Sequence, residues 1–191
     1  MRGPEARPLE SVTDEVVVLV DSGGSPIGLS PKSSVHGRRT PLHLAFSHYL
    51  FDDDDRVLMT RRALSKPTWP GVWTNTCCGH PTPGEPISDA VRRRLKLELG
   101  LEATDLTCVL PDFAYTATDP SGIVENEICP VYEGRLLHPE PDILPNPDEV
   151  MDWKWVPWDD LTRAVRLTPF AFSPWSVMQI GRLDGARSQS K

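Results

Sequence analysis

The sequence predicts one α/β domain, and this prediction depends on chain length, apolar runs and one helical repeat. The chain has 191 residues, an ordinary size for a single domain with its own core. Short apolar runs bounded by turn residues predict strands on both sides of a central amphipathic helix. Residues 1–13 and 185–191 are polar and lack this periodicity, so we expect flexible tails around a domain at 14–184.

Strands are predicted before the helix. The run EVVVLVD at 15–21 ends in the turn sequence DSGGSPIG, which predicts a buried strand followed by a tight return. The segment LHLAFSHYLF at 42–51 alternates in polarity and predicts one strand, and VLMTRRA at 57–63 returns after a solvated DDDDR turn. Lys32 and His36 are expected in a polar loop.

The central helix is predicted at residues 87–99. Apolar residues recur there every four positions, at Ile87, Val91, Leu95 and Leu99. Pro86 suits the first turn, and Gly100 is a typical C-terminal stop. Arg94 and Glu98 are one turn apart and share a face. Because Glu98 lies off the apolar stripe, folding alone does not explain it.

Further strands are predicted at 106–110, 112–118 and 123–133. In the third strand, Glu125 and Glu127 point to one side and the apolar residues beside them to the other. The two acids form either a solvated outer face or a pair of ligands. A proline-rich stretch at 139–147 then predicts an extended surface loop, and a strand that enters a helix near Pro157 follows.

The last predicted element is a terminal helix within 168–183, which carries Trp175 and Met178. Most of the six tryptophans are expected in the core.

Composition excludes several classes of partner. A net charge of −7 argues against nucleic acid as a general partner, because the surface as a whole repels phosphate. No apolar run reaches the length of a membrane span. Four cysteines without a signal peptide indicate a cytoplasmic chain with reduced thiols. We expect a monomer that acts on a small molecule.

A motif around the helix resembles the Nudix pattern. Its Gly, Glu, Arg, apolar and Gly positions are filled in register by Gly79, Glu85, Arg93, Leu95, Glu98, Gly100 and Leu101. Arg94 and Leu97 stand where the pattern has acids, which hold the divalent ions used for diphosphate cleavage. One remaining acid and one cation suit a helix that binds diphosphate without cutting it.

Three histidines and two glutamates are candidate metal ligands. His36, His43, His80, Glu125 and Glu127 together would suit a six-coordinate divalent ion. Their spacing along the chain does not by itself bring them together.

A longer resemblance covers roughly residues 36–178. The ordered strings HLAFS, RRALSK, WPGVWTN, CGHP, GE, ELG, ATDPSGIVENE, DEVMDW and AFSPW are similar to the type I isopentenyl-diphosphate Δ-isomerases, a branch of the Nudix fold. The resemblance implies an α/β/α Nudix fold with a mixed central sheet. It also implies interconversion of isopentenyl and dimethylallyl diphosphate by a 1,3-proton shift in isoprenoid biosynthesis.

The resemblance also implies roles for individual residues. One divalent metal, Mn²⁺, Mg²⁺ or Zn²⁺, would be held by His36, His43, His80, Glu125 and Glu127. Cys78 would be one acid/base, and Glu127, aided by Tyr115, the other. Glu98 would hold a substrate-bound Mg²⁺, with positive charge from Lys32, Arg62, Lys66 and Arg94. Trp175 would face the hydrocarbon end of the substrate.

These roles suit the chemistry, because protonation of an alkene creates a carbocation that an indole face can stabilise. We expect nearby cations to bring the titration of Cys78 within reach of neutral pH. If residues 76–80 are extended, Cys78 and His80 share a side and Cys77 points away. Two other classes remain open, a Nudix hydrolase and a metal-binding scaffold protein without enzymatic activity.

Overall fold

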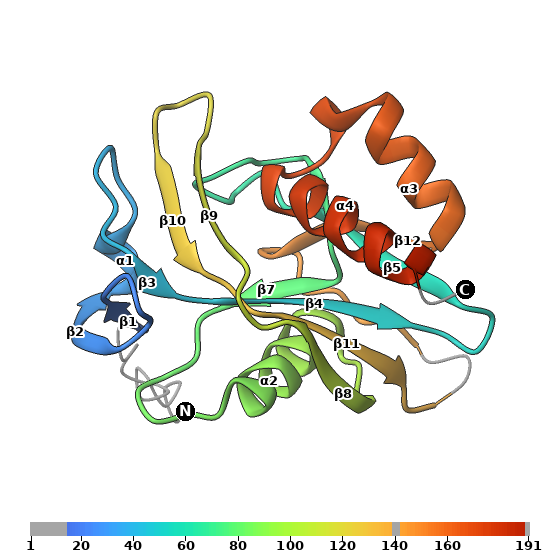
Figure 1. Ribbon diagram of the computed structural model, residues 1–191, viewed down its shortest axis with the longest axis horizontal. Helices are drawn as coiled ribbons and strands as arrows, with labels where there is room; N and C mark the ends of the chain where they lie inside the picture. Colours follow the sequence, from blue (N-terminus) through green and yellow to red (C-terminus); the bar gives the residue numbers. More distant parts are fainter. Residues whose placement is uncertain (1–14, 139–141, 190–191) are drawn as a thin grey trace, which may run out of the picture.

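The computed structural model describes residues 15–138 and 142–189 and contains two mixed β-sheets with helices on both faces of the larger one (Figure 1). The smaller sheet has the order β2 (Pro26–Pro31), β1 (Val16–Val20), β3 (His43–Leu44), β10 (Val124–Ile128) and β9 (Ala114–Thr118). The larger sheet has the order β12 (Val150–Pro157), β5 (Arg56–Arg62), β4 (Phe46–Phe51), β11 (Val131–Leu136) and β8 (Ala103–Leu110). Two short strands extend it, β6 (Trp73–Thr74) beside β5 and β7 (Cys77–Gly79) beside β4.

The helices are α1 (Lys32–Val35), α2 (Ile87–Leu99), α3 (Trp158–Leu167) and α4 (Pro174–Gln189), with a 3₁₀ turn at Pro169–Ala171. In Figure 1, α2 covers one face of the larger sheet, and α3 and α4 cover the other. This arrangement confirms the predicted α/β/α architecture with a mixed sheet. The predicted N-terminal tail, residues 1–13, lies outside the described residues.

Two predicted strands are each divided between the two sheets. The segment 42–51 pairs in the smaller sheet up to Leu44 and in the larger sheet from Phe46, and 123–133 behaves in the same way around Cys129 and Pro130. Pro130 has no N–H to give to a sheet ladder, which favours a break there. The two segments pass from one sheet to the other side by side and pair in parallel in both sheets. His43 is paired with Glu127, and Ser47 with Val131.

Helix α2 has the predicted bounds, and Gly100 ends it in the left-handed conformation with φ of 70°. Its residues Val91, Leu95 and Leu99 are fully buried and pack in one core cluster with Phe46 and Leu50 of β4. The buried face is wider than the apolar stripe, because Arg94 and Glu98 are buried too. Glu98 lies off the apolar stripe, as predicted, and is buried in a pair with Arg94.

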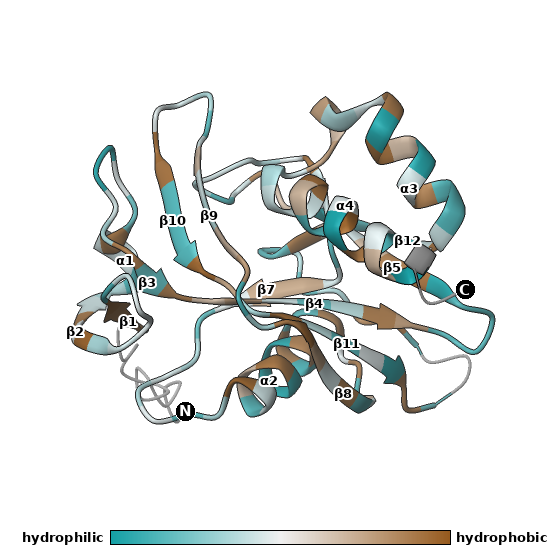
Figure 2. Cartoon of the chain, viewed as in Figure 1, coloured by the Kyte–Doolittle hydropathy of each residue, from teal (hydrophilic) through white to brown (hydrophobic). Residues whose placement is uncertain are grey.

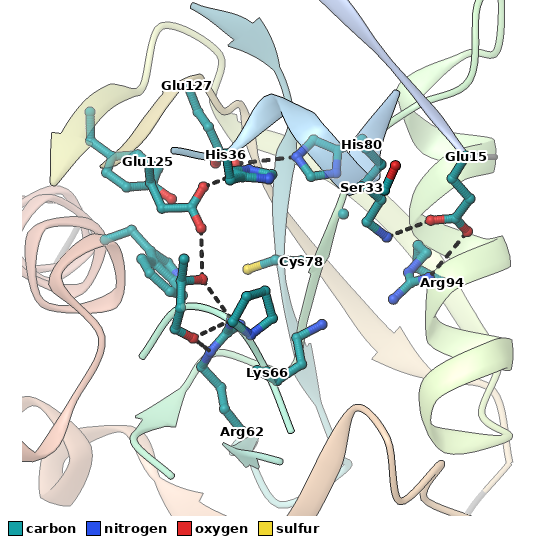
Figure 3. Close-up of a pocket in the computed structure, with 16 residues that line it drawn as sticks. Glu15, Ser33, His36, Arg62, Lys66, Cys78, His80, Arg94, Glu125 and Glu127 are labelled. Atoms are coloured by element: carbon teal, nitrogen blue, oxygen red, sulfur yellow. Dashed lines mark hydrogen bonds and ion pairs between the residues drawn. The ribbon is translucent and has the colours of Figure 1, made fainter. Parts of the chain in front are cut away.

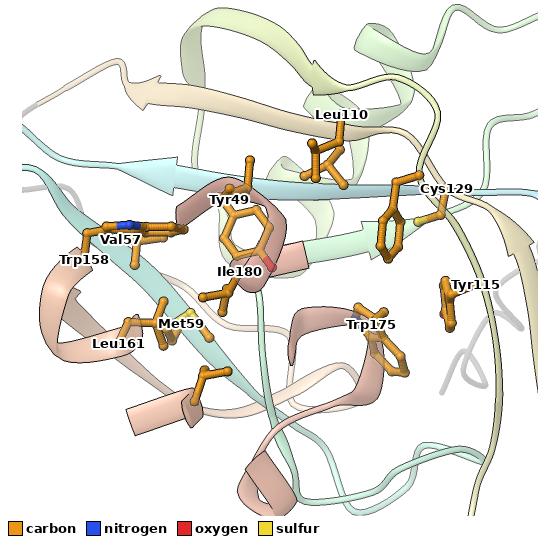
Figure 4. Close-up of a cluster of buried hydrophobic side chains, with 14 of the residues drawn as sticks. Tyr49, Val57, Met59, Leu110, Tyr115, Cys129, Trp158, Leu161, Trp175 and Ile180 are labelled. Carbon is orange, nitrogen blue, oxygen red and sulfur yellow. The ribbon is translucent and has the colours of Figure 1, made fainter. Parts of the chain in front are cut away.

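A second core cluster lies under α3 and α4. Figure 4 shows Tyr49, Trp158, Leu161 and Ile180 in this cluster, with Trp175 near its end. Hydrophobic residues are concentrated along the central strands, and hydrophilic residues occupy the loops and outer helix faces (Figure 2). None of the helices in the described part of the chain combines the length and hydrophobicity that a bilayer span requires.

Two local predictions differ from the structure. Lys32 begins one helical turn instead of lying in an open loop. Helix α4 continues to Gln189, beyond residue 185 where the predicted flexible tail begins. The extension is held because the Arg187 guanidinium lies over the rings of Phe51 and Trp158 and pairs with Glu133.

Candidate active site

A cavity of about 390 Å³ lies where the two sheets meet and is lined by most of the predicted site residues. Figure 3 shows Cys78 between a histidine and glutamate group on one side and basic side chains on the other. Predicted residues that line the cavity are Lys32, His36, Arg62, Lys66, Cys78, His80, Arg94, Tyr115, Glu125, Glu127 and Trp175. His43 and Glu98 are buried next to these residues.

Four of the five predicted ligands of the first metal form one group. Candidate ligand atoms of His36, His43, His80 and Glu127 all lie within 4.8 Å of one another. His36 follows α1, His43 lies in β3, His80 follows β7 and Glu127 lies in β10. The crossing strands thus bring together residues that their spacing did not connect.

The polar atoms of this group fit a divalent cation. The Nε2 atoms of His36, His43 and His80 are buried, and none donates or accepts a hydrogen bond within the described chain. Buried polar atoms are normally satisfied, so a shared ligand would explain all three. His43 is oriented by its Nδ1, which lies 2.9 Å from the carbonyl oxygen of Pro41; a metal-bound imidazole is commonly held in this way through its other ring nitrogen.

Protonation states suit a metal at His80 and Glu127. At His43, burial alone would lower the pKa, but contacts with Glu127 outweigh burial and raise it, so a metal there would have to displace a proton. Burial lowers the pKa of His80, which leaves its imidazole neutral at pH 7. Burial alone would raise the pKa of Glu127, but its contacts with His43 and His80 outweigh burial and hold the pKa below its usual value. Neutral imidazole and carboxylate are the forms that bind divalent ions.

Glu125 lies at the edge of the group. Its Oε2 is 2.9 Å from His36 Nε2, and its Oε1 accepts a hydrogen bond of 2.8 Å from Thr68 Oγ1. Both Glu125 and Glu127 are 7% exposed, so the interpretation of these acids as a solvated outer face is wrong.

The two adjacent thiols lie on opposite sides of β7, as the extended backbone predicts. Cys77 belongs to the core cluster under α2, whereas Cys78 lines the cavity with His80. All four cysteines are free in the structure. Burial raises the pKa of the Cys78 thiol to about 11, so the expectation of titration near neutral pH is wrong: burial outweighs the nearby cations.

Tyr115 and Trp175 enclose the cavity near Cys78. Tyr115 is the direct cross-strand partner of Glu127, and its ring centroid lies 5.7 Å from that of Trp175. Trp175 is 3% exposed and also faces the Arg62 guanidinium at 5.4 Å. This end of the cavity therefore combines a proton-holding thiol, a carboxylate and aromatic rings.

Lys32, Lys66 and Arg94 form the other end, whereas Arg62 lies against the Trp175 ring; each of the four has an acidic or carbonyl partner. Arg94 donates to Glu98 and Glu149, and Lys66 also donates to Glu149. Lys32 pairs with Glu15, whose other oxygen lies 3.9 Å from Arg94. Arg94 lines the cavity, whereas its partner Glu98 does not. Arg62 donates to the main-chain oxygen of Thr68.

Several residues at the site had no role in the sequence analysis. Glu149 joins Lys66 to Arg94, and Thr68 joins Arg62 to Glu125. Glu149 follows the proline-rich stretch, where no periodic pattern indicates which way a side chain points. Asn75 contacts Cys78, but the side-chain alternation that puts Cys78 and His80 on one side of the strand puts position 75 on the other side. The alternation therefore gave no reason to include Asn75 in the site.

Known proteins resemble this chain in sequence and in fold. The NUDIX domain model matches residues 41–178. The chain is 57% identical to the isopentenyl-diphosphate Delta-isomerase of Agromyces mediolanus over 92% of this chain and 84% of that protein. The Frankia alni protein of the same name is 58% identical over 87% of this chain and 84% of its own length. The Mycolicibacterium vanbaalenii protein is 56% identical, with coverage of 91% and 94%.

Solved structures support the fold. DR0079 from Deinococcus radiodurans has a TM-score of 0.66 at 19% identity and covers 88% of this chain and 98% of its own. A MutT protein from Methanosarcina mazei has a TM-score of 0.58 at 17% identity, with coverage of 79% and 97%. At this level of identity the likeness concerns the fold alone.

Proposed function

The chain belongs to the isopentenyl-diphosphate Delta-isomerases of the NUDIX domain family, and from this premise we propose how its cavity interconverts isopentenyl and dimethylallyl diphosphate. The observation that carries the proposal is the composition of one cavity. Cys78 and Glu127 line it beside Trp175, and basic side chains line its other end. The first end suits an alkene and the second a diphosphate.

The proton shift needs a donor on one side of the substrate and an acceptor on the other. We assign these roles to Cys78, whose thiol holds its proton at neutral pH, and to Glu127, which is a carboxylate. A proton adds to the terminal alkene carbon, and the cation forms at the adjacent carbon. Loss of a proton on the far side then creates the new double bond. Tyr115 lies beside Glu127 and assists it.

The cation needs stabilisation without water. Trp175 presents an indole ring at the same end of the cavity, and attraction of a desolvated cation to such a ring contributes ~2 kcal/mol or more. Binding of the remote diphosphate by Lys32, Arg62, Lys66 and Arg94 would hold the alkene against the reacting groups.

Divalent metal binding fits the buried group described above. We propose that His36, His43, His80, Glu125 and Glu127 hold one ion, either Mn²⁺, Mg²⁺ or Zn²⁺. A second ion, Mg²⁺, would join Glu98 to the substrate diphosphate. Glu98 now binds Arg94, so this role requires the Arg94 side chain to share or release Glu98 when substrate arrives. A bound cation supplies positive charge to the diphosphate and to the carboxylates around it.

The test is incubation with isopentenyl diphosphate and Mg²⁺, followed by identification of the product after acid treatment, since allylic diphosphates are acid-labile. Formation of the allylic isomer supports the proposal. Release of inorganic phosphate would instead indicate a hydrolase, and the absence of any reaction with prenyl diphosphates would favour a scaffold protein.

We also propose a cytoplasmic monomer that does not bind nucleic acid. Support comes from the net charge of −7 and the four free cysteines. Light scattering of the purified protein tests the monomer, because a dimer would double the measured mass.

A further inference from the structure

Asn75 connects two proposed catalytic side chains through one atom. Its Oδ1 accepts a hydrogen bond from Trp175 Nε1 at 3.0 Å, and the thiol of Cys78 donates to the same oxygen at 3.2 Å. Thr74 Oγ1 donates to it as well, at 2.8 Å. Asn75 is fully buried, so these contacts are shielded from water.

The main chain fixes the orientation of the Asn75 amide. Its Nδ2 donates to the carbonyl oxygens of Cys77, at 2.8 Å, and His48, at 3.2 Å. Carbonyl oxygens can only accept hydrogen bonds, so the NH₂ group must face them. The oxygen of Asn75 therefore faces Cys78 and Trp175.

Cys78 and Trp175 come from separate elements that Asn75 joins. Cys78 lies in β7 and Trp175 in the first turn of α4. The start of α4 is also held here, because Ser173 N donates to the carbonyl oxygen of Trp73 at 2.8 Å. The sulfur of Cys78 is held from a second direction by Ser47 Oγ at 3.4 Å.

We propose that Asn75 is a positioning residue that holds the Cys78 sulfur and the Trp175 ring in a fixed relation to the substrate's double bond. This inference rests on the proposed function. In this proposal Asn75 does not contact the substrate. Asn75 acts by limiting how far Cys78 and Trp175, which do contact the substrate, can move.

The reaction itself reports this role. The Cys78 S–H bond breaks as its proton joins the terminal CH₂, which uses the electron pair of the double bond and becomes a methyl group, while sulfur keeps the S–H electrons. A C–H bond on the far side then breaks, its electrons form the new double bond, and Glu127 takes the proton. The product has two distinct methyl groups, and the new one stays distinct only if the cation does not rotate about the bond that becomes double. A fixed Trp175 ring would prevent that rotation.

The experiment runs the reaction in D₂O with Asn75→Ala and locates deuterium in the first allylic product by NMR. We expect label in one methyl group with the parent and in both with Asn75→Ala. Turnover should fall at least about 100-fold, while inhibition by inorganic diphosphate stays within about threefold, because no hydrogen bond in the described chain joins Asn75 to Lys32, Lys66 or Arg94.

Thr76→Val is the matched control. Thr76 is also fully buried in this segment, and its hydroxyl donates to the Leu58 carbonyl oxygen instead of contacting the cavity. Thr76→Val loses two buried hydrogen bonds, one donated to the Leu58 carbonyl oxygen and one accepted from Leu50 N, and should keep label in one methyl group. Trp175→Phe tests the same contact from its other end, since phenylalanine keeps a ring but lacks the Nε1 donor. It should also place label in both methyl groups.

The outcomes separate this inference from the proposed function. If the parent forms no allylic product, the proposed function fails. Label in both methyl groups of the parent's product would overturn the inference alone. A folded Asn75→Ala that keeps the label in one methyl group would also overturn the inference. If Asn75→Ala does not fold, the same result with a folded Trp175→Phe would overturn it.

Discussion

His43 and Glu127 are direct partners in the parallel strands β3 and β10, and Glu127 Oε1 lies 3.5 Å from His43 Nε2. Backbone pairing fixes the separation of the two side chains, so the proposed catalytic carboxylate of Glu127 is held beside a proposed metal ligand, His43. Loss of a ligand should therefore affect metal binding before it affects the fold.

The first prediction concerns this metal. His43→Ala and Glu125→Gln should each lower the bound divalent metal per chain, measured by elemental analysis after reconstitution and desalting. His48→Leu is the control, because His48 is buried in β4 and lies outside the ligand group. Unchanged stoichiometry in both ligand variants would remove the site. A loss in His43→Ala alone would exclude Glu125 from the ligand set.

Local features of the fold could be predicted from the sequence, because their causes are local. The bounds of α2 follow from a four-residue repeat, Pro86 and Gly100, and all three act within a few residues. The division of residues 42–51 between two sheets could not be predicted, since the side chains alternate in the same way across Ala45 whichever sheet they join.

The site was predictable in membership more than in arrangement. The resemblance identified His36, His43 and His80, but only the crossing strands show how they meet. Periodicity placed Glu98 outside the apolar stripe, yet a buried ion pair with Arg94 makes its charge compatible with burial. A pattern of hydrophobic residues cannot reveal such a pair.

The second prediction concerns Glu98. Its side chain and that of Arg94 are both 8% exposed and are joined by a 2.6 Å contact. Glu98→Gln keeps the shape, and Arg94 keeps Glu149 as a partner, so we expect a loss of about 1–3 kcal/mol in unfolding free energy. Turnover should fall at least about 100-fold, because the proposed Mg²⁺ site loses its charge.

Urea unfolding and turnover at saturating Mg²⁺ measure both effects. Glu102→Gln is the control. Glu102 follows α2 and pairs with Lys96 of that helix at the exposed surface, so this variant should change neither the unfolding free energy nor the turnover. Parent-like turnover in a folded Glu98→Gln would show that Glu98 is structural only.

The third prediction concerns acid stability. Burial lowers the pKa of His48 to about 3, whereas an unfolded histidine titrates near 6.5. Below about pH 6.5 the unfolded chain binds a proton that the folded chain does not, so this residue lowers stability progressively as pH falls toward 3. Above pH 6.5 it has no such effect.

His48→Leu removes that titration. Between pH 7.5 and 5.0, the unfolding free energy of the parent should fall by roughly 2 kcal/mol more than that of the variant. Urea unfolding at both pH values, with metal chelated in each sample, provides the comparison. Equal losses in the two proteins would mean that His48 is protonated in the folded state.

The last prediction separates the adjacent thiols. Cys78 lines the cavity, so Cys78→Ala should lower turnover at least about 1,000-fold while inhibition by inorganic diphosphate is unchanged, because a proton donor is lost and the basic residues remain. Cys77 packs under α2 and is 2% exposed, so Cys77→Ala should stay within about tenfold of the parent rate. It should lose about 1–2 kcal/mol of stability, as expected for a trimmed core group.

Turnover, diphosphate inhibition and urea unfolding of both variants decide this assignment. Each variant is the control for the other, since the same thiol is removed from neighbouring positions on opposite sides of β7. Cys78→Ala with parent-like turnover would exclude the thiol from proton transfer. An inactive Cys77→Ala that remains folded would show that Cys77, although it packs under α2, is needed for turnover, and would overturn the assignment.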